Sequence, residues 1–120
     1  MTAFTREDIP VAIEGGGVEV RLQEVGEMTL AYIHLPQGTD MGPTLKGLEN
    51  DLCQCPHWGY LFKGRIKMRT ASGEDVYEAG QAYYWAPGHA PEALEDSDVV
   101  EFSPTAAFME VMDHVKAQMG

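Results

Sequence analysis

Two cysteines and a histidine alternate over five residues near the middle of the chain, in the segment Cys53-Gln54-Cys55-Pro56-His57. In extended backbone, successive side chains point to opposite faces, so Cys53, Cys55 and His57 would share one face. Thiolate sulfur and neutral imidazole nitrogen bind zinc and iron, and four-coordinate sites of mixed cysteine and histidine are common. The spacing therefore predicts a metal site on this segment.

Other roles are open to the two cysteines. A small buried hydrophobe is the ordinary role of a free cysteine, and this interpretation stays open for Cys53. A disulfide between Cys53 and Cys55 would be strained because one residue separates them, and a reducing cytosol would oppose it. The chain has no other cysteine, which leaves free thiols or metal ligands.

Composition limits the classes of partner. The 120 residues suit a single domain, 1–120, with a core of its own, since 44% of them are hydrophobic. The formal charge of −11 would repel a phosphate backbone, so we expect no nucleic-acid partner. No apolar run approaches the roughly 20 residues that cross a bilayer, so we expect no membrane span. The first ten residues lack the pattern of a signal peptide, which favours a cytoplasmic protein.

Alternation and turn residues divide most of the chain into short strands. Residues 1–17 look like a lead-in, and the clearest hairpin is expected over 57–70, with its turn at Lys63-Gly64. Acidic side chains in the last strand segment are expected to form a solvated rim. The predicted strand segments are 18–25, 28–35, 57–70, 75–77, 81–86 and 91–102, and the rim acids are Glu92, Glu95, Asp96, Asp98 and Glu101.

A helix is predicted over 103–119, with Ser103 as N-cap and Pro104 at the first helical position. Its apolar residues recur at helical spacing, so we expect the helix to pack on the outside of the β domain. His114 lies off this stripe and is expected to be exposed, whereas His34 is expected to be partly exposed or hydrogen-bonded locally. The stripe consists of Phe108, Val111, Met112, Val115 and Met119.

Many short strands followed by one helix are typical of an all-β sandwich or barrel. The segment 57–64 also resembles part of the first motif of small cupins. In that motif two histidines, one residue apart, are followed by a glutamate and then, after six intervening residues, by a turn glycine. Here His57 stands at the glutamate, Cys53 at the second histidine and Asp51 at the first.

The second cupin motif has a counterpart further along the chain. Gly80 and Gly88 keep its glycine spacing, while Pro91 occupies the position of its histidine and His89, two residues earlier, is the natural substitute. The resemblance implies a cupin double-stranded β-helix, which is a jelly-roll barrel, over 18–102. Cupin sites ordinarily use three histidines and a glutamate, which favour iron or manganese. Cysteine and histidine in their place shift the preference to zinc, with iron and nickel as alternatives.

The candidate site residues follow from the spacing and the resemblance together. Asp51 and Glu92 are weaker candidates, for which solvated surface is the simpler interpretation. For His89 the competing interpretation is a loop histidine that hydrogen-bonds a backbone carbonyl. The predicted metal ligands are Cys53, Cys55, His57 and His89, and the predicted pocket wall is Tyr60, Tyr83 and Trp85.

Two functions fit this pattern. The first is a metal-dependent cupin whose site is structural with four protein ligands and, with three, is catalytic in an enzyme that acts on a small polar metabolite. The second is a metal-free binding or sensory module with aromatic pocket walls. Trp58 and Phe62, on the opposite face of their strand from His57, would form an apolar patch in a monomer. Because small cupins often pair, we expect a homodimer.

Overall fold

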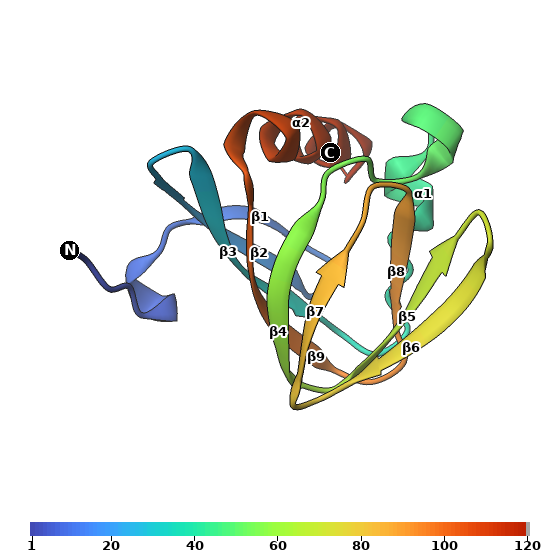
Figure 1. Cartoon of the computed structure of the whole chain (residues 1–120), viewed down its shortest axis with the longest axis horizontal. Helices are drawn as coiled ribbons and strands as arrows, with labels where there is room; N and C mark the ends of the chain where they lie inside the picture. Colours follow the sequence, from blue (N-terminus) through green and yellow to red (C-terminus); the bar gives the residue numbers. More distant parts are fainter. Residues whose placement is uncertain (120) are drawn as a thin grey trace.

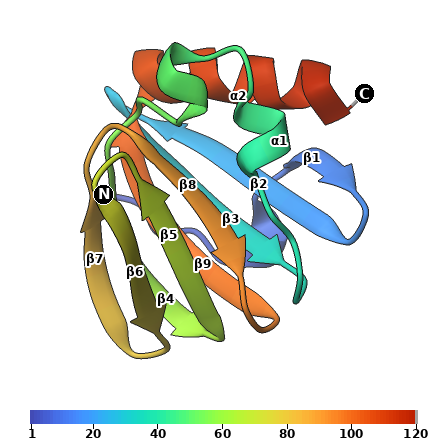
Figure 2. The ribbon, with the colours of Figure 1, turned by 90° about the vertical axis from the view of Figure 1, so that its right-hand side faces the viewer.

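A computed structural model describes residues 1–119, and these contain nine strands in two antiparallel sheets, with a long helix after the last strand. The six-stranded sheet has the order β1-β2-β3-β9-β4-β7 and the three-stranded sheet the order β6-β5-β8. The sheets curve toward each other around the core (Figures 1 and 2). The strands are β1 Val11–Gly15, β2 Val18–Val25, β3 Met28–Leu35, β4 His57–Lys63, β5 Arg65–Thr70, β6 Gly73–Glu78, β7 Gln81–Trp85, β8 His89–Ala93 and β9 Ser97–Pro104; the α-helices are α1 Gly42–Leu45 and α2 Thr105–Met119, and Arg6–Asp8 and Glu49–Asp51 form 3-10 turns.

The predicted all-β fold with a C-terminal helix is confirmed, and the lead-in proves to be partly sheet. Val11–Gly15 pairs with β2 as strand β1. The turn between them uses Gly16 and Gly17, both at positive φ, a conformation that glycine adopts without strain. Ile13 on β1 is buried, so this first strand contributes to the core.

The predicted hairpin over 57–70 is wrong, because β4 and β5 do not pair with each other. β4 pairs with β7 and β9, whereas β5 pairs with β6 and β8. Gly64, at φ +93°, turns the chain from one sheet into the other, and a side chain there would collide with the backbone of Asp96 and Ser97. The Ser97 hydroxyl accepts a hydrogen bond from the Arg65 amide at 3.0 Å and so holds this corner closed.

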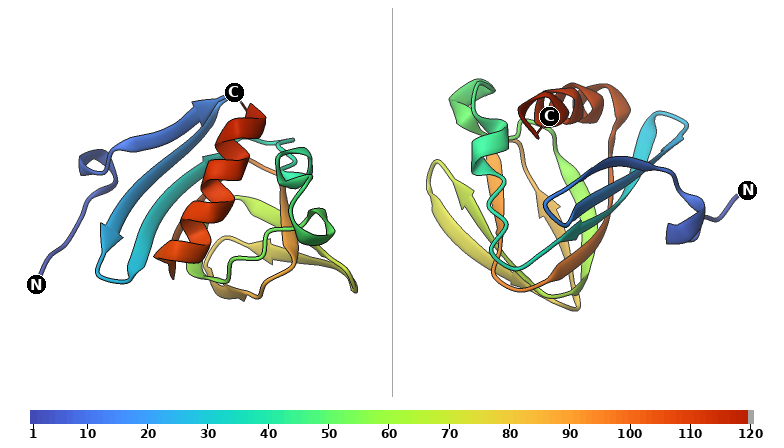
Figure 3. Two further views of the ribbon diagram at one scale, coloured as in Figure 1. Left: turned by 90° about the horizontal axis from the view of Figure 1, so that it is seen from above. Right: turned by 180° about the vertical axis from the view of Figure 1, so that it is seen from behind.

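The C-terminal helix begins at Thr105, two residues later than predicted, because Ser103 and Pro104 continue strand β9. It lies across the open end between the two sheets and not on the outside of the barrel (Figures 1 and 3). The predicted apolar stripe faces the interior, where Phe108, Val111 and Val115 are buried. The helix therefore closes the interior that the strands enclose.

The loop that leads from β3 to β4 packs beside this helix (Figure 3). His114 hydrogen-bonds the Lys46 carbonyl at 2.7 Å, so it is only partly exposed. His34 hydrogen-bonds Asp98 at 2.8 Å, which confirms the local partner expected for it. No helix within residues 1–119 has the length and apolar character needed to cross a membrane.

Candidate metal centre

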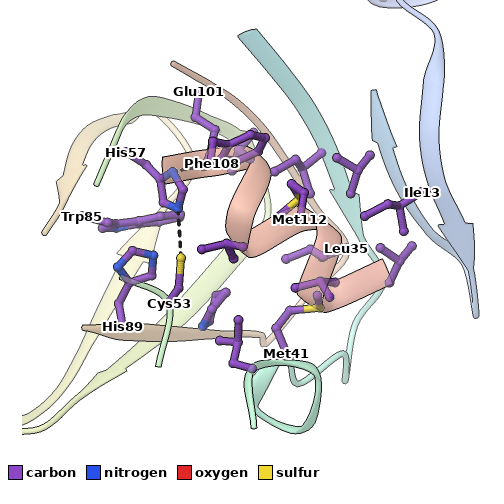
Figure 4. Close-up of a pocket in the computed structure, with 18 of the residues that line it drawn as sticks. Ile13, Leu35, Met41, Cys53, His57, Trp85, His89, Glu101, Phe108 and Met112 are labelled. Atoms are coloured by element: carbon purple, nitrogen blue, oxygen red, sulfur yellow. Dashed lines mark hydrogen bonds and ion pairs between the residues drawn. The ribbon is translucent and has the colours of Figure 1, made fainter. Parts of the chain in front are cut away.

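Three buried side chains meet beneath helix α2: Cys53, His57 and His89. One ligand atom from each lies within 4.8 Å of the other two, and Cys53 Sγ is 3.6 Å from His57 Nε2 (Figure 4). The three residues are 4%, 5% and 2% exposed, respectively. A thiol and two imidazoles are thus gathered at one point in the interior.

Backbone pairing explains this convergence. Cys53 forms an isolated antiparallel bridge with His89, in which the Cys53 amide donates to the His89 carbonyl at 2.8 Å. His89 begins β8 in the smaller sheet, and His57 begins β4 in the larger one. The segment that carries Cys53 therefore spans the gap between the sheets and brings the two histidines to the same end of the barrel.

The hydrogen bonds of the two histidines fix which nitrogen faces the cluster. His89 Nδ1 lies 2.6 Å from the carbonyl of Ala86, which can only accept, so Nδ1 carries the proton. His57 Nδ1 lies 2.7 Å from Ser103 Oγ and 3.1 Å from a carboxylate oxygen of Glu101. In neutral rings both Nε2 atoms are then left with free lone pairs, the form of imidazole that binds a metal.

Burial sets the protonation of the cluster. It lowers the pKa values of His57 and His89 to about 4, so both rings are neutral at pH 7. It raises the pKa of the Cys53 thiol to about 12, so this sulfur keeps its proton unless a cation displaces it.

Glu101 completes the surroundings of His57, and the prediction of a solvated rim is wrong for this acid. Its side chain is 2% exposed, and burial raises its pKa to about 7. Tyr83 donates a hydrogen bond to its other oxygen at 2.6 Å. Gly59 lies between Tyr83 and Glu101 in the sheet, and a side chain there would meet the Tyr83 hydroxyl. The missing side chain therefore lets the tyrosine reach across β4 to the carboxylate.

A cavity of about 80 Å³ adjoins the cluster and runs beneath α2 (Figure 4). Cys53, His57, His89 and Glu101 line it at one end, and aliphatic side chains line most of the rest. Trp85 and His89 line both this cavity and an open groove of about 620 Å³ on the outer side. These two side chains are therefore the wall between the cavity and the groove.

The chain resembles solved structures in its fold. No protein-family model matches the chain, and no curated protein matches it. KdgF from Halomonas sp. superposes with a TM-score of 0.64 at 19% identity, over 87% of this chain and 94% of KdgF. An RmlC-like cupin from Shewanella frigidimarina gives 0.62 at 15% identity, over 84% of this chain and 88% of its own. This chain has the cupin fold.

A third cupin-fold match covers a part of a longer protein. A mutant of oxalate decarboxylase OxdC from Bacillus subtilis superposes with a TM-score of 0.64 at 19% identity, over 84% of this chain. The matched region is 28% of the decarboxylase. At these identities the likeness concerns the fold, and one fold can carry many functions.

Three of the four predicted metal ligands come together, and Cys55 does not. Cys55 is fully buried, but its sulfur lies outside the cluster, 3.4 Å from the Pro56 carbonyl oxygen. The chain bends at Cys55, so residues 53–57 are not the continuous strand that strict alternation assumed. The cupin motifs had pointed to Cys53 and His57, with His89 as a substitute for Pro91, but also to Asp51, which lies outside the cluster.

The remaining predicted residues divide between interior and surface. Trp85 lines the cavity, and Tyr83 stacks on it with ring centroids 3.5 Å apart. Tyr60 is 42% exposed on the outer face of β4, so its predicted place in the pocket wall is wrong. Asp51 is exposed and accepts from the Gly47 amide, and Glu92 pairs with Lys67, so neither carboxylate belongs to the cluster.

Sequence reasoning missed Glu101, although the alternation of its strand contained the signal. Ser97, Val99, Glu101 and Ser103 fall on one face of β9, and all four are buried. Since Val99 marks this face as the interior, the same periodicity places the carboxylate inside.

Proposed function

We propose that this cupin binds a divalent metal ion through Cys53 Sγ, His57 Nε2 and His89 Nε2, and a small molecule beside it. Zinc is the first choice because it accepts mixed sulfur and nitrogen ligands, with iron and nickel as alternatives. The observation that carries the proposal is the orientation of the two histidines. Ser103 Oγ lies beside His57 Nδ1 and the Ala86 carbonyl beside His89 Nδ1, which turns both Nε2 atoms toward the Cys53 sulfur.

The charges around the cluster fit a divalent cation. A Cys53 thiolate and the Glu101 carboxylate together carry two negative charges, which a divalent ion would offset. Among the described residues, no lysine or arginine lines the cavity to play that part. A buried charge without a partner is costly, so a cation in the cluster would lower the cost of keeping Glu101 ionised.

Three protein donors leave room for one further ligand, as in catalytic zinc sites and unlike closed four-ligand structural sites. When bound, such a metal acts as a Lewis acid that polarises an oxygen of the molecule beside it. The residues around it hold the ligand geometry: Ser103, Glu101 and the Ala86 carbonyl fix the two rings, and Phe108 on α2 covers His57 with ring centroids 5.7 Å apart.

The alternative is a metal-free binding or sensory module, for which the buried, protonated thiol and the closed cavity would be sufficient. The two cysteines provide a matched pair of variants to decide between them. We expect about one equivalent of metal in the wild type and in Cys55→Ser, measured by elemental analysis after purification with zinc and dialysis. Cys53→Ser should retain less than a tenth of this amount. Equal loss from both variants, or a folded wild type with no retained metal, would refute the metal site.

The outer face of the larger sheet supports a second proposal, that two copies of the chain form a homodimer. Trp58 lies directly opposite Tyr84 on β7 and Phe102 on β9, and the three are 46%, 53% and 46% exposed. Tyr60 and Phe62 extend the patch along β4. Since aromatic side chains bury about 150–250 Å² each, five that are half exposed present about 500 Å², a large share of the ~800 Å² that each partner of a stable dimer buries.

Both cysteines are free thiols. A reducing compartment maintains this state. The cytoplasmic location predicted from the sequence therefore stays part of the proposal.

A further inference from the structure

The cavity beneath α2 is unlike the site expected for a polar metabolite. Its polar groups are confined to the end that holds the cysteine–histidine cluster. Beyond this end the wall is formed by side chains that offer no hydrogen bond, contributed by β1, β2, β3 and α2. Those side chains include Ile13, Val18, Val20, Leu35, Val111 and Val115. Empty apolar cavities of this kind stay dry and bind small apolar molecules.

We propose that this cavity binds a short, neutral aliphatic molecule whose single oxygen lies at the end formed by Cys53, His57 and His89. The contact of that oxygen with a metal rests on the function proposed above. Binding of the aliphatic part does not, because it depends only on the apolar wall. The two ideas can therefore fail separately.

The volume limits the size of the molecule. An apolar cavity of about 150 Å³ binds benzene, which has six non-hydrogen atoms. A cavity of about 80 Å³ then accommodates about three or four non-hydrogen atoms. A hexose, with twelve, is too large for the space as it stands. The ligand class is therefore that of the C2 to C3 mono-oxygenated aliphatic compounds.

The charges disfavour an anion. Glu101 is the one acidic side chain among the lining residues that the structure describes, and no basic side chain lines the cavity to balance a second negative group. The formal charge of −11 also repels anions at a distance. A neutral head group avoids both costs.

The polar end of the cavity accounts for the oxygen. Cys53, His57 and His89 line the cavity at that end, and a thiol and two imidazoles are hydrogen-bonding groups. An ether, carbonyl or hydroxyl oxygen can pair with them, whereas a hydrocarbon leaves them without a partner.

The test is a chain-length series of primary alcohols, from ethanol to 1-octanol, followed by NMR shifts of the Met112 methyl group on α2. Each added methylene buried in an apolar wall should tighten binding about fourfold. The gain should stop near 1-propanol, where the cavity is full. The matching α,ω-diols place a second hydroxyl against the aliphatic wall and should bind at least tenfold more weakly.

Variants check that the cavity sets the limit. Val111→Ala enlarges it, so the longest alcohol that still gains affinity should be one or two carbons longer. Val76→Ala, at a position 46% exposed on β6, is the matched control and should leave the series unchanged. A chain-length series that is flat in the wild type, or diols that bind as well as the alcohols, would overturn the inference.

The same series on protein stripped of metal separates this inference from the proposed function. We expect all affinities to fall by a common factor while the gain per methylene persists. A protein that holds no metal but shows the fourfold gain would disprove the metal centre and leave the aliphatic site standing. Retained metal with no gain would do the reverse.

Discussion

Replacing Glu101 by glutamine tests whether the buried carboxylate supports the metal through His57. Glutamine keeps the size of the side chain and an acceptor oxygen for the His57 Nδ1–H, and its amide can donate to the Tyr83 hydroxyl. The substitution therefore removes the charge and little else. Carboxylates that hold metal-bound histidines contribute 10–100-fold to metal affinity, or about 1.4–2.7 kcal/mol. Glu101 and His57 are 2% and 5% exposed and 3.1 Å apart, so solvent screens little of the charge.

We therefore expect Glu101→Gln to weaken zinc binding by close to 100-fold, measured by competition with a chelating indicator at pH 7.5. Glu92→Gln is the matched control, because Glu92 is half-buried, pairs with Lys67 and lies outside the cluster. Its affinity should stay within twofold of the wild type. An affinity of Glu101→Gln that equals the control would show that the carboxylate has no part in holding the metal. Unchanged urea unfolding of the metal-free variant would confirm that its fold is intact.

Two further predictions concern stability and assembly. His57 and His89 have pKa values of about 4 when folded against an ordinary 6.5, so the unfolded chain binds more protons between these values. The free energy of unfolding of metal-free protein, measured in urea titrations, should therefore fall by about 1 kcal/mol for each unit that the pH is lowered near pH 5.5. The raised pKa of Glu101 opposes only part of this trend. Equal stability at pH 7 and pH 5 would contradict the prediction. In sedimentation experiments the wild-type protein should have about twice the monomer mass of 13.2 kDa. The variant Trp58→Glu should be a monomer that retains its metal, and the control Val76→Glu should remain a dimer. A monomeric wild type, or a monomeric control, would refute the proposed interface.

The strands were predictable because their signals are local. Alternation identified β2, β3 and β4, and His57 and Trp58 lie on opposite faces of β4 as predicted, with His57 buried and Trp58 exposed. Tyr60, predicted for the pocket wall, shares the exposed face of Trp58. It was harder to predict which strands pair with each other. A tight hairpin and a corner between sheets both need a glycine at positive φ, and the contacts that distinguish them at Gly64 come from Ser97, 33 positions further along the chain.

The errors at the site also arose because local alternation does not show how distant segments pair. The assumption that alternation continues through residues 53–57 ignored Pro56, which has no amide to donate to a neighbouring strand and is out of place inside a sheet. The chain bends there, so Cys55 turns toward its own backbone while Cys53 pairs with His89. The resemblance to cupins placed Cys53 and His57 in the cluster, because a motif encodes the whole barrel and not a single strand. It also pointed to Asp51, which is exposed, and it reached His89 only as a substitute for Pro91.

The position of negative charge is the feature in which this chain departs most from the cupin motifs that it resembles. The alignment puts the neutral His57 where cupins place a glutamate, and Cys53, a thiolate in the proposed site, where they place a neutral histidine. The two exchanges together therefore keep one negative charge among the proposed ligands. Glu101 adds a second charge from the neighbouring strand, one imidazole further from the cluster. The row Tyr83–Gly59–Glu101 supports it there, since only a glycine lets the Tyr83 hydroxyl approach within 2.6 Å of the carboxylate. The second charge of the proposed site therefore lies behind His57, which leaves the space beside the proposed ligands for a molecule that carries no charge.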